Sequence, residues 1–212
     1  MRTVTTNSEQ EIHMTMRQNT KFRMRTARLC PATPEEIREL ILKCQGDPGL
    51  RVAGNIIRAV ANTGLRVEEL KSLRISDIDA TGEWLTVARP RNMRGDGRVV
   101  PIFARTCGAL RELHGMNPLS EFILGDRHRT RIDQTIRILK ILAPQLARTR
   151  LWIHSVRMNY ETRMYAAGVP SGIVKYLLGR ESLGEALKFS SLTRDQVLQI
   201  VRRTLERFLP EL

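Results

Sequence analysis

Two short stretches of this chain carry arginine, glutamate and histidine at spacings that suit chemistry on a phosphate. The first holds Arg66 and Glu69, and the second holds His154 and Arg157, each pair three residues apart. Residues three apart in a helix lie on one face, so both members of a pair can act at one point. Arginine suits a phosphate because its planar, permanently charged fork matches two phosphate oxygens. The pairs therefore predict a site that neutralises a phosphodiester.

Metal-free cleavage of a phosphodiester needs three kinds of group. The charge of the transition state must be neutralised, a nucleophile must attack in line, and an acid must protonate the departing sugar oxygen. Arg66 is expected at a helix N-terminus, where backbone N–H groups favour an anion, with Glu69 holding its guanidinium. Each element alone is a weak signal, because an Arg–Glu pair at this spacing is commonly a solvated helix pair and a single histidine is commonly structural.

The elements that position these residues are expected to be mainly helical. Thr33 to Glu36 has a capping-box pattern with proline at the first helical position, which predicts a helix start. Trp84–Ala88 alternates as a strand, and Arg98–Ile102 is its expected antiparallel partner across a Gly-Asp-Gly turn. A short helix should follow Arg66. Apolar periodicity predicts further helices over about 50–62, 104–114, 130–142, 154–167, 170–179, 183–190 and 193–208.

The charge of the chain points to a polyanionic partner. Its 212 residues carry a formal net charge of +13, and a compact domain this basic is usually built to meet a polyanion. Binding to RNA would explain the charge equally well. Residues 1–29 are polar and basic, which fits a disordered tail, a basic arm that tracks a phosphate backbone, or both. The candidate phosphate contacts in this arm include Arg23, Arg25 and Arg28.

Other function classes have little support in the sequence. No apolar run is long enough to span a bilayer and no signal-peptide core is present, so a cytoplasmic location is expected. Cys30, Cys44 and Cys107 are scattered without a CxxC pair, which favours reduced thiols over a zinc site or disulfides. Glycine-rich phosphate loops are also absent. We therefore expect no metal and no cofactor.

Taken in order, the two motifs resemble the signature boxes of the tyrosine recombinases, the phage-integrase and Xer-like family. The first box is TGLRVEELKSLRISDID at 63–79. The second is HSVRMNYETRMYAAGVPSGIVKYLLGRESLGEALKFSSL at 154–192. The resemblance covers roughly residues 33–212, including the hairpin between the boxes. It implies a catalytic domain of mainly α structure with a small antiparallel β-sheet, which we assign to residues 30–212, after the basic arm at 1–29.

The resemblance also implies a mechanism and partners. In this family two arginines and a histidine surround the scissile phosphate of double-stranded DNA, and a tyrosine attacks it to form a 3′-phosphotyrosyl link. A hairpin lysine protonates the 5′ oxygen, and neither metal nor nucleotide is used. Arg66, Glu69, His154 and Arg157 match the family positions directly. Cleavage would occur in a tetrameric synapse, with a monomer expected in free solution.

The C-terminal helix is expected to carry an apolar stripe. The stripe either packs in the domain's own core or, as the corresponding helix of the family often does, docks onto a neighbouring protomer. Its predicted members are Gln196, Val197, Ile200, Val201, Leu205 and Phe208.

Three positions depart from the family pattern. Arg180 follows the LLG segment where the family usually has histidine or tryptophan, and arginine there can still donate to a phosphate. No lysine lies between residues 71 and 140, so Arg91 and Arg94 are the nearest replacements for the hairpin lysine, and Arg94 is the candidate acid. Arginine holds its proton too tightly to be a good acid. Phe189, nine residues after Arg180, occupies the position of the nucleophilic tyrosine and has no hydroxyl.

Phenylalanine at position 189 has two main interpretations. One is an engineered Tyr→Phe change that allows DNA binding without cleavage, which the complete Arg66, Glu69, His154 and Arg157 set favours. The other is a naturally inactive DNA-binding relative that acts as a regulator or structural partner, which the missing lysine favours. An RNA-binding protein with accidental motif matches is a third interpretation, but no RNP-like aromatic stripe supports it. Tyr160, Tyr165 and Tyr176 are expected to be core or surface aromatics and not relocated nucleophiles.

The amino-terminal segment is too short for the separate DNA-clamping domain that many family members carry. Either that domain has been removed, or the protein is a compact recombinase whose basic arm does part of the gripping.

Overall fold

A computed structural model of the chain describes residues 31–88, 97–142, 152–182, 184, 193–208 and 211–212. The chain divides into two units, Met1–Cys30 and Pro31–Leu212, and every described residue belongs to the second. The predicted basic arm over 1–29, with Arg23, Arg25 and Arg28, therefore lies outside the described residues. It remains a prediction.

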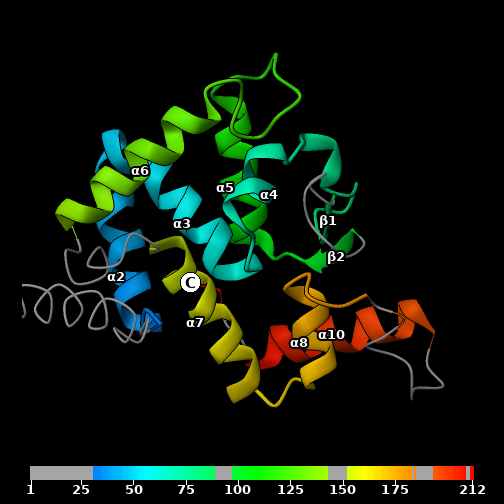
Figure 1. Ribbon diagram of the computed structural model, residues 1–212. Helices are drawn as coiled ribbons and strands as arrows, with labels where there is room; N and C mark the ends of the chain where they lie inside the picture. The colour runs from blue at the N-terminus through cyan, green and yellow to red at the C-terminus, as the bar shows by residue number, and fades with distance from the viewer. Residues whose placement is uncertain (1–30, 89–96, 143–151, 183, 185–192, 209–210) are drawn as a thin grey trace, which may run out of the picture. The chain divides into compact units, whose positions relative to one another are not determined.

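Helix α3 (Arg51–Thr63) forms the centre of the described unit. Its residues from Ala53 to Thr63 are all buried, the polar Asn55, Arg58, Asn62 and Thr63 included, because neighbouring elements cover the helix on all sides. Four other helices contact it, as Figure 1 shows. They are α2 (Pro34–Gln45), α5 (Ala104–Gly115), α6 (His128–Leu142) and α7 (Trp152–Ala166).

The predicted start of α2 is confirmed. The Thr33 hydroxyl accepts a hydrogen bond from the Glu36 amide at 3.2 Å, and the Glu36 carboxylate accepts one from the Thr33 amide at 2.8 Å. This reciprocal pair satisfies two backbone donors that a helix start otherwise leaves open. The helices predicted over 50–62, 104–114, 130–142, 154–167, 170–179 and 193–208 are also present, with ends shifted by a few residues.

A two-stranded antiparallel sheet carries the hairpin. Strands β1 (Trp84–Val87) and β2 (Arg98–Pro101) pair with Trp84 opposite Pro101 and Val87 opposite Arg98. Both strands are one residue shorter than predicted. Most of the predicted hairpin loop, with Arg91 and Arg94, lies outside the described residues. The fold class is therefore mainly α with a small antiparallel sheet, as expected.

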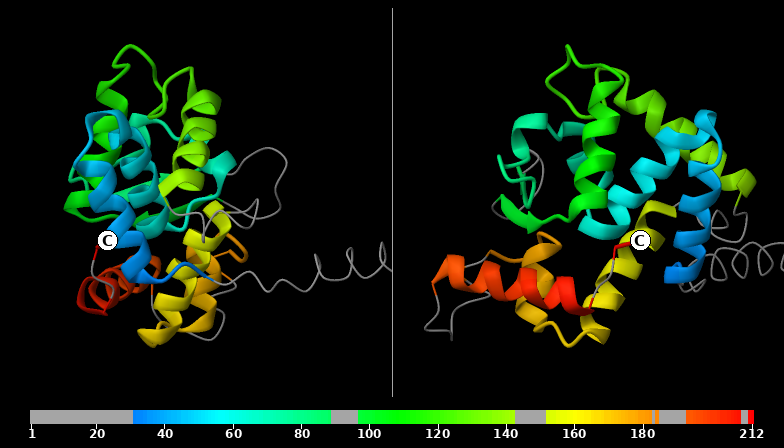
Figure 2. Two further views of the ribbon diagram at one scale, coloured as in Figure 1. Left: turned by 90° about the vertical axis from the view of Figure 1, so that its left-hand side faces the viewer. Right: turned by 180° about the vertical axis from the view of Figure 1, so that it is seen from behind.

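Three short or C-terminal elements complete the unit: α4 (Val67–Ser72), α8 (Ser171–Leu177) and α10 (Arg194–Phe208). Helix α10 lies beside β2, as the right-hand view of Figure 2 shows. Arg202 secures this contact. Its guanidinium lies 5.7 Å from the ring centre of Trp84 and 5.2 Å from that of Phe103, and it donates to the main-chain oxygens of Glu83 and Ile102.

The predicted stripe of α10 is only partly correct. Val197, Val201 and Leu205 are buried, whereas Gln196 is exposed and Ile200 is 50% exposed. Each residue of a helix turns by about 100°, so Gln196 and Ile200 lie at the edge of the buried face, and Leu198 lies on it. The side chain of Phe208 lies outside the described part of the chain, although its main chain ends α10. Of the helix predicted near 183–190, only residue 184 is described.

Two features of the described residues bear on the cysteines and on membrane-spanning helices. Cys44 and Cys107 are free and buried, and Cys30 lies outside the described residues. Among the described helices, none is both long and apolar enough to cross a membrane.

Candidate active site

Glu69 is a buried carboxylate that two arginines share. It accepts hydrogen bonds from the Arg66 amide at 2.7 Å and from Arg66 Nη1 at 2.9 Å. Arg98 adds a two-pronged contact, Nη1 to Oε1 at 2.7 Å and Nη2 to Oε2 at 2.9 Å. Burial by itself raises the pKa of Glu69, but the hydrogen bonds and charges of Arg98 and Arg66 outweigh it and lower the pKa to about 2. The pair is thus an ionised, buried contact and not a solvated helix pair.

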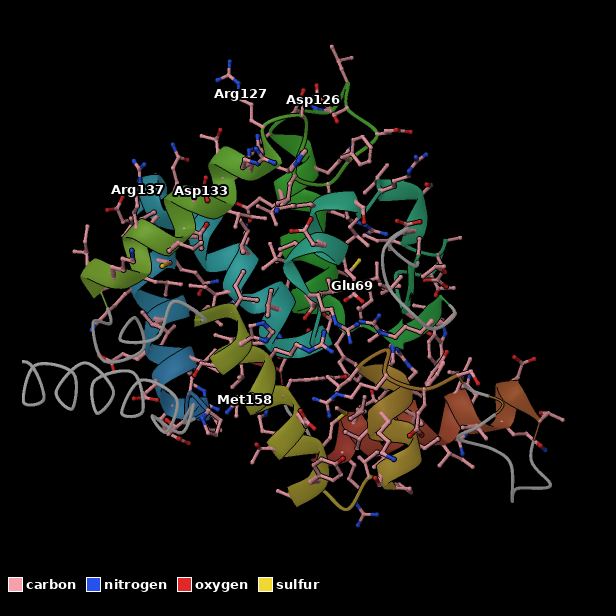
Figure 3. The ribbon with its side chains drawn as sticks, in the orientation of Figure 1. Glu69, Asp126, Arg127, Asp133, Arg137 and Met158 are labelled. Atoms are coloured by element: carbon pink, nitrogen blue, oxygen red, sulfur yellow. The ribbon has the colours of Figure 1, made fainter. Side chains whose placement is uncertain are left out.

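Arg66 is the N-cap of α4, as predicted from the sequence. Its side chain is 26% exposed while that of Glu69 is 2% exposed, so the guanidinium is held on its Glu69 side and open on another. The first amides of α4 lie next to it, and such amides favour an anion. Figure 3 labels Glu69 and shows nitrogen-bearing side chains close to it.

Arg157 joins the second motif to the first. It lies on α7 and is 5% exposed. Its Nη1 donates to the Gly64 carbonyl at 2.6 Å and lies 3.8 Å from Glu69 Oε2. Burial, then the charge of Arg66, lowers the pKa of Arg157 to about 9, with Glu69 opposing and Arg98 and Arg180 adding to the effect. The arginines therefore repel one another across a site that holds one buried carboxylate.

Three consecutive carbonyls at the C-terminal end of α8 each accept a hydrogen bond from a different arginine. Carbonyls at a helix C-terminus have no partner within the helix, and the negative end of the helix dipole favours cations. The pairs are Leu177 with Arg98 Nε at 2.6 Å, Leu178 with Arg157 Nη2 at 2.6 Å and Gly179 with Arg66 Nη2 at 3.4 Å. The LLG segment thus orients the arginines with its main chain.

Gly179 makes this close approach possible. Its φ is +62°, and a Cβ there would lie 2.7 Å from Arg98 Nη1 and 3.1 Å from Arg66 Nη1. Any other residue would be strained in this conformation and would push against two guanidinium groups.

Arg98 was not among the residues selected from the sequence. It is the first residue of β2 and is 4% exposed. A signal for it does exist, because alternation along the strand puts Arg98 on the same face as the buried Val100. An arginine on a buried face needs a carboxylate partner.

Two predicted site residues, His154 and Arg180, form no hydrogen bond or ion pair with Glu69 within the described part of the chain. His154 is exposed on α7, one turn before Arg157. Arg180 forms a two-pronged pair with Glu161, at 2.5 and 2.7 Å, and this hydrogen bond raises the pKa of Arg180. The guanidinium of Arg180 is therefore already engaged, although it is close enough to affect the charge of Arg157. Phe189, Arg91 and Arg94 lie outside the described residues, so their predicted roles remain predictions.

The three tyrosines have the positions expected of core and surface aromatics. Tyr160 is fully buried, which raises its pKa. Tyr176 is 3% exposed and accepts a hydrogen bond from the Val99 amide at 2.9 Å. Tyr165 is 43% exposed, but eight residues of helix place it about 12 Å along α7 from Arg157.

The mainly helical fold with a small sheet occurs in a known family, and the sequence places the chain in it. The sequence profile of the phage integrase family matches residues 32–200. The chain belongs to this family, the tyrosine recombinases.

Two curated relatives show how much of a family member this chain represents. Tyrosine recombinase XerC of Pelobacter propionicus is 28% identical over 153 residues, which cover 68% of this chain and 49% of the relative. XerC of Halalkalibacterium halodurans is 26% identical over 186 residues, covering 79% of this chain and 59% of the relative. The chain therefore spans half to three fifths of the relatives it matches.

A solved structure supports the fold alone. The integrase of transposon Tn1549, in a form with a tyrosine replaced by phenylalanine and in complex with transposon right end DNA, superposes with a TM-score of 0.60. It is 18% identical in sequence, and the match covers 87% of this chain and 68% of that one.

Proposed function

We propose that this domain binds duplex DNA and holds one phosphodiester against Arg66 and Arg157, as the strand-cleaving part of a site-specific recombinase. One observation carries the proposal: three guanidinium groups surround a single buried carboxylate. The cluster therefore has an excess of two positive charges, which is costly in a buried site unless an anion compensates it.

The excess charge matches the needs of phosphodiester cleavage. A phosphodiester carries one negative charge and gains a second as a nucleophilic oxygen adds to phosphorus. A site with two surplus positive charges is best balanced by the transition state, and such differential stabilisation is what accelerates a reaction. The same charge also favours the ground-state phosphate, so the cluster supports DNA binding as well as cleavage.

The chemical step follows the family's mechanism. A tyrosine oxygen at position 189 would form a bond to phosphorus while the bond from phosphorus to the 5′ oxygen breaks. The tyrosine gives up its proton, and the departing 5′ oxygen takes one. The product is a 3′-phosphotyrosyl link, and the reverse step rejoins a strand. With Phe189 there is no attacking oxygen, so this chain binds DNA without cutting it.

The acid for the 5′ oxygen comes from the hairpin in this family. Arg94, or Arg91 beside it, is the candidate substitute for the hairpin lysine, and an arginine releases its proton reluctantly. Even with tyrosine restored we expect slow cleavage. His154, exposed one turn from Arg157, is the candidate for a second donor to the phosphate.

The decisive experiment restores the missing oxygen. Duplexes that bind the Phe189 chain are selected from a random library, rebuilt with nicks at successive positions, and incubated with the Phe189→Tyr variant. We expect a covalent protein–DNA adduct on a denaturing gel. The original chain should bind the same duplexes without an adduct, and Phe189→Tyr combined with Arg66→Ala should form none. If Phe189→Tyr forms no adduct on any bound duplex, the cleaving function is wrong.

A second function is favoured by the same residue. Phe189 and the absence of lysine between residues 71 and 140 fit a naturally inactive relative that occupies DNA as a regulator or structural partner. This function predicts tight, Arg66-dependent duplex binding together with no adduct after Phe189→Tyr. Competition between duplex DNA and RNA separates both functions from an RNA-binding role.

A further inference from the structure

Arg98 connects three parts of the chain that are distant in sequence. From the first position of β2 it reaches Glu69, 29 residues away, and the Leu177 carbonyl, 79 residues away. Its Nε, Nη1 and Nη2 atoms all donate hydrogen bonds in these contacts. Because all three of its side-chain nitrogens are engaged by protein groups, Arg98 holds other parts of the site.

The contact with Glu69 affects how Arg66 can be used. Arg98 donates to both oxygens of the carboxylate, whereas the Arg66 side chain donates to one. Arg98 thus supplies most of the compensation that a buried carboxylate requires. Arg66 keeps N–H donors that are not committed to Glu69, on a guanidinium that is still partly exposed.

The contact with Leu177 acts on the other side of the site. The next two carbonyls, of Leu178 and Gly179, receive Arg157 and Arg66. A 2.6 Å bond to the first carbonyl of this run therefore fixes the two that follow. Arg98 also lies against Gly179, where a Cβ would be 2.7 Å from its Nη1.

We propose that Arg98 is a positioning residue of the recombinase site. It orders Glu69 on one side and the Leu177–Gly179 carbonyls on the other, so that Arg66 and Arg157 present their free donors to one phosphate. The catalytic consequence of this proposal rests on the proposed function. Its geometric consequence, the position of the Arg66 side chain, is tested without cleavage.

The geometric test uses the Phe189 chain. The side-chain Nε–H signal of Arg66 is recorded by NMR in the unchanged chain and in Arg98→Met, Arg98→Lys and Val87→Ala. Val87 is the cross-strand partner of Arg98 and is buried, so Val87→Ala weakens the hairpin without removing a contact to Glu69. We expect the Arg66 signal to shift or broaden in both Arg98 variants and to stay in place in Val87→Ala. An unchanged Arg66 signal in Arg98→Met would overturn the proposal.

The catalytic test repeats the series with Phe189→Tyr. Misplacing a catalytic group by about 1 Å costs on the order of a hundredfold in rate, so we expect Arg98→Met to slow adduct formation by about tenfold to a hundredfold. The affinity for DNA should change by less than about threefold, because Arg98 does not touch the phosphate and the change falls on the chemical step. Arg98→Lys keeps the positive charge but lacks the two-pronged guanidinium. Its rate of adduct formation should therefore lie between that of Arg98→Met and that of the protein with Arg98.

The outcomes distinguish the possible failures. Equal losses of affinity and rate in Arg98→Met, matched by Val87→Ala at the same melting temperature, would mean that Arg98 is only structural. If Arg98→Met does not fold, Arg98→Lys decides by the same two measurements. If Phe189→Tyr forms no adduct at all, the cleaving function fails, and the Arg66 signal still decides whether Arg98 positions it.

Discussion

Arg157 donates a 2.6 Å hydrogen bond to the carbonyl of Gly64, a residue 93 positions earlier in the chain. This bond fastens α7 to the loop between α3 and α4, and so joins the two motifs that the sequence separates. The carbonyl is available because Gly64 ends α3 in the left-handed conformation, with φ +63°. Its missing side chain also makes room for Tyr160.

Gly64→Ala should destabilise the domain. The left-handed conformation is strained for alanine, and the new Cβ would lie 2.6 Å from Tyr160 Cδ1. We expect a loss of roughly 1–3 kcal/mol in the free energy of unfolding, the usual range for such backbone strain, measured by urea denaturation. Gly108→Ala is the matched control, because a Cβ at Gly108 meets nothing within 4 Å. It should stabilise α5 by about 0.5–1 kcal/mol. Equal effects of the two changes would contradict the explanation.

Glu69 should make the free energy of unfolding depend on pH in the acid range. Its pKa is lowered in the folded state, from 4.5 to about 2, so its contribution is complete above the unfolded value and is lost as the pH falls toward 2. A difference of this size corresponds to about 3 kcal/mol. Urea titrations between pH 6 and 2.5 should therefore show a steep loss of stability in the original chain.

Glu69→Gln is the variant that isolates this contribution. It should lose about 3–5 kcal/mol at neutral pH, because two buried guanidinium groups and the partly exposed one of Arg66 are left without a carboxylate. Its stability should fall less between pH 5 and 2.5. Glu121→Gln removes an exposed partner of Arg74 and should leave the acid profile unchanged. A steep profile that persists in Glu69→Gln would assign the effect to other groups.

The basic arm should be visible in the salt dependence of DNA binding. Each phosphate contact contributes about 0.9 to the slope of log affinity against log salt. Replacing Arg23, Arg25 and Arg28 by alanine should flatten the slope by up to about 3, and deleting residues 1–29 should flatten it at least as much. Fluorescence anisotropy over a series of salt concentrations measures both. A slope that survives the deletion would place all phosphate contacts in residues 30–212.

Ile200 is the residue of α10 that we expect to matter between protomers. It is 50% exposed, so Ile200→Glu should change the free energy of unfolding by no more than about 0.5 kcal/mol. If α10 docks onto a neighbouring protomer on DNA, the same change should weaken tetramer formation there while the free protein stays monomeric. Sedimentation of the protein alone and with duplex DNA measures both states.

Ile141→Glu provides the control for this experiment, because Ile141 is a 77% exposed residue on α6. It should leave assembly unchanged. If the Ile200 and Ile141 variants assemble equally on DNA, α10 does not form the interface between protomers.

Much of this architecture could be predicted from the sequence, because it depends on residues that are close together in the chain. The capping box at Thr33 and the three-residue spacings of Arg66 with Glu69 and of His154 with Arg157 depend on neighbours within one helical turn. Such relationships follow from helix geometry alone. The contact between Arg66 and Glu69 was therefore predictable, as were the hairpin strands and most helix positions.

The sequence by itself thus indicated Arg66, Glu69 and Arg157 of the charged cluster and the order in which they come, but it did not indicate Arg98. The tertiary structure decided how they are held: Arg98 doubly bonded to Glu69, Arg180 engaged by Glu161, and the arginines received by the carbonyls of Gly64 and of Leu177 to Gly179. The physical reason is that every residue carries the same carbonyl oxygen. Residue type does not reveal which carbonyl a distant guanidinium will reach, and only the packing of α4, α7, α8 and β2 brings those partners together.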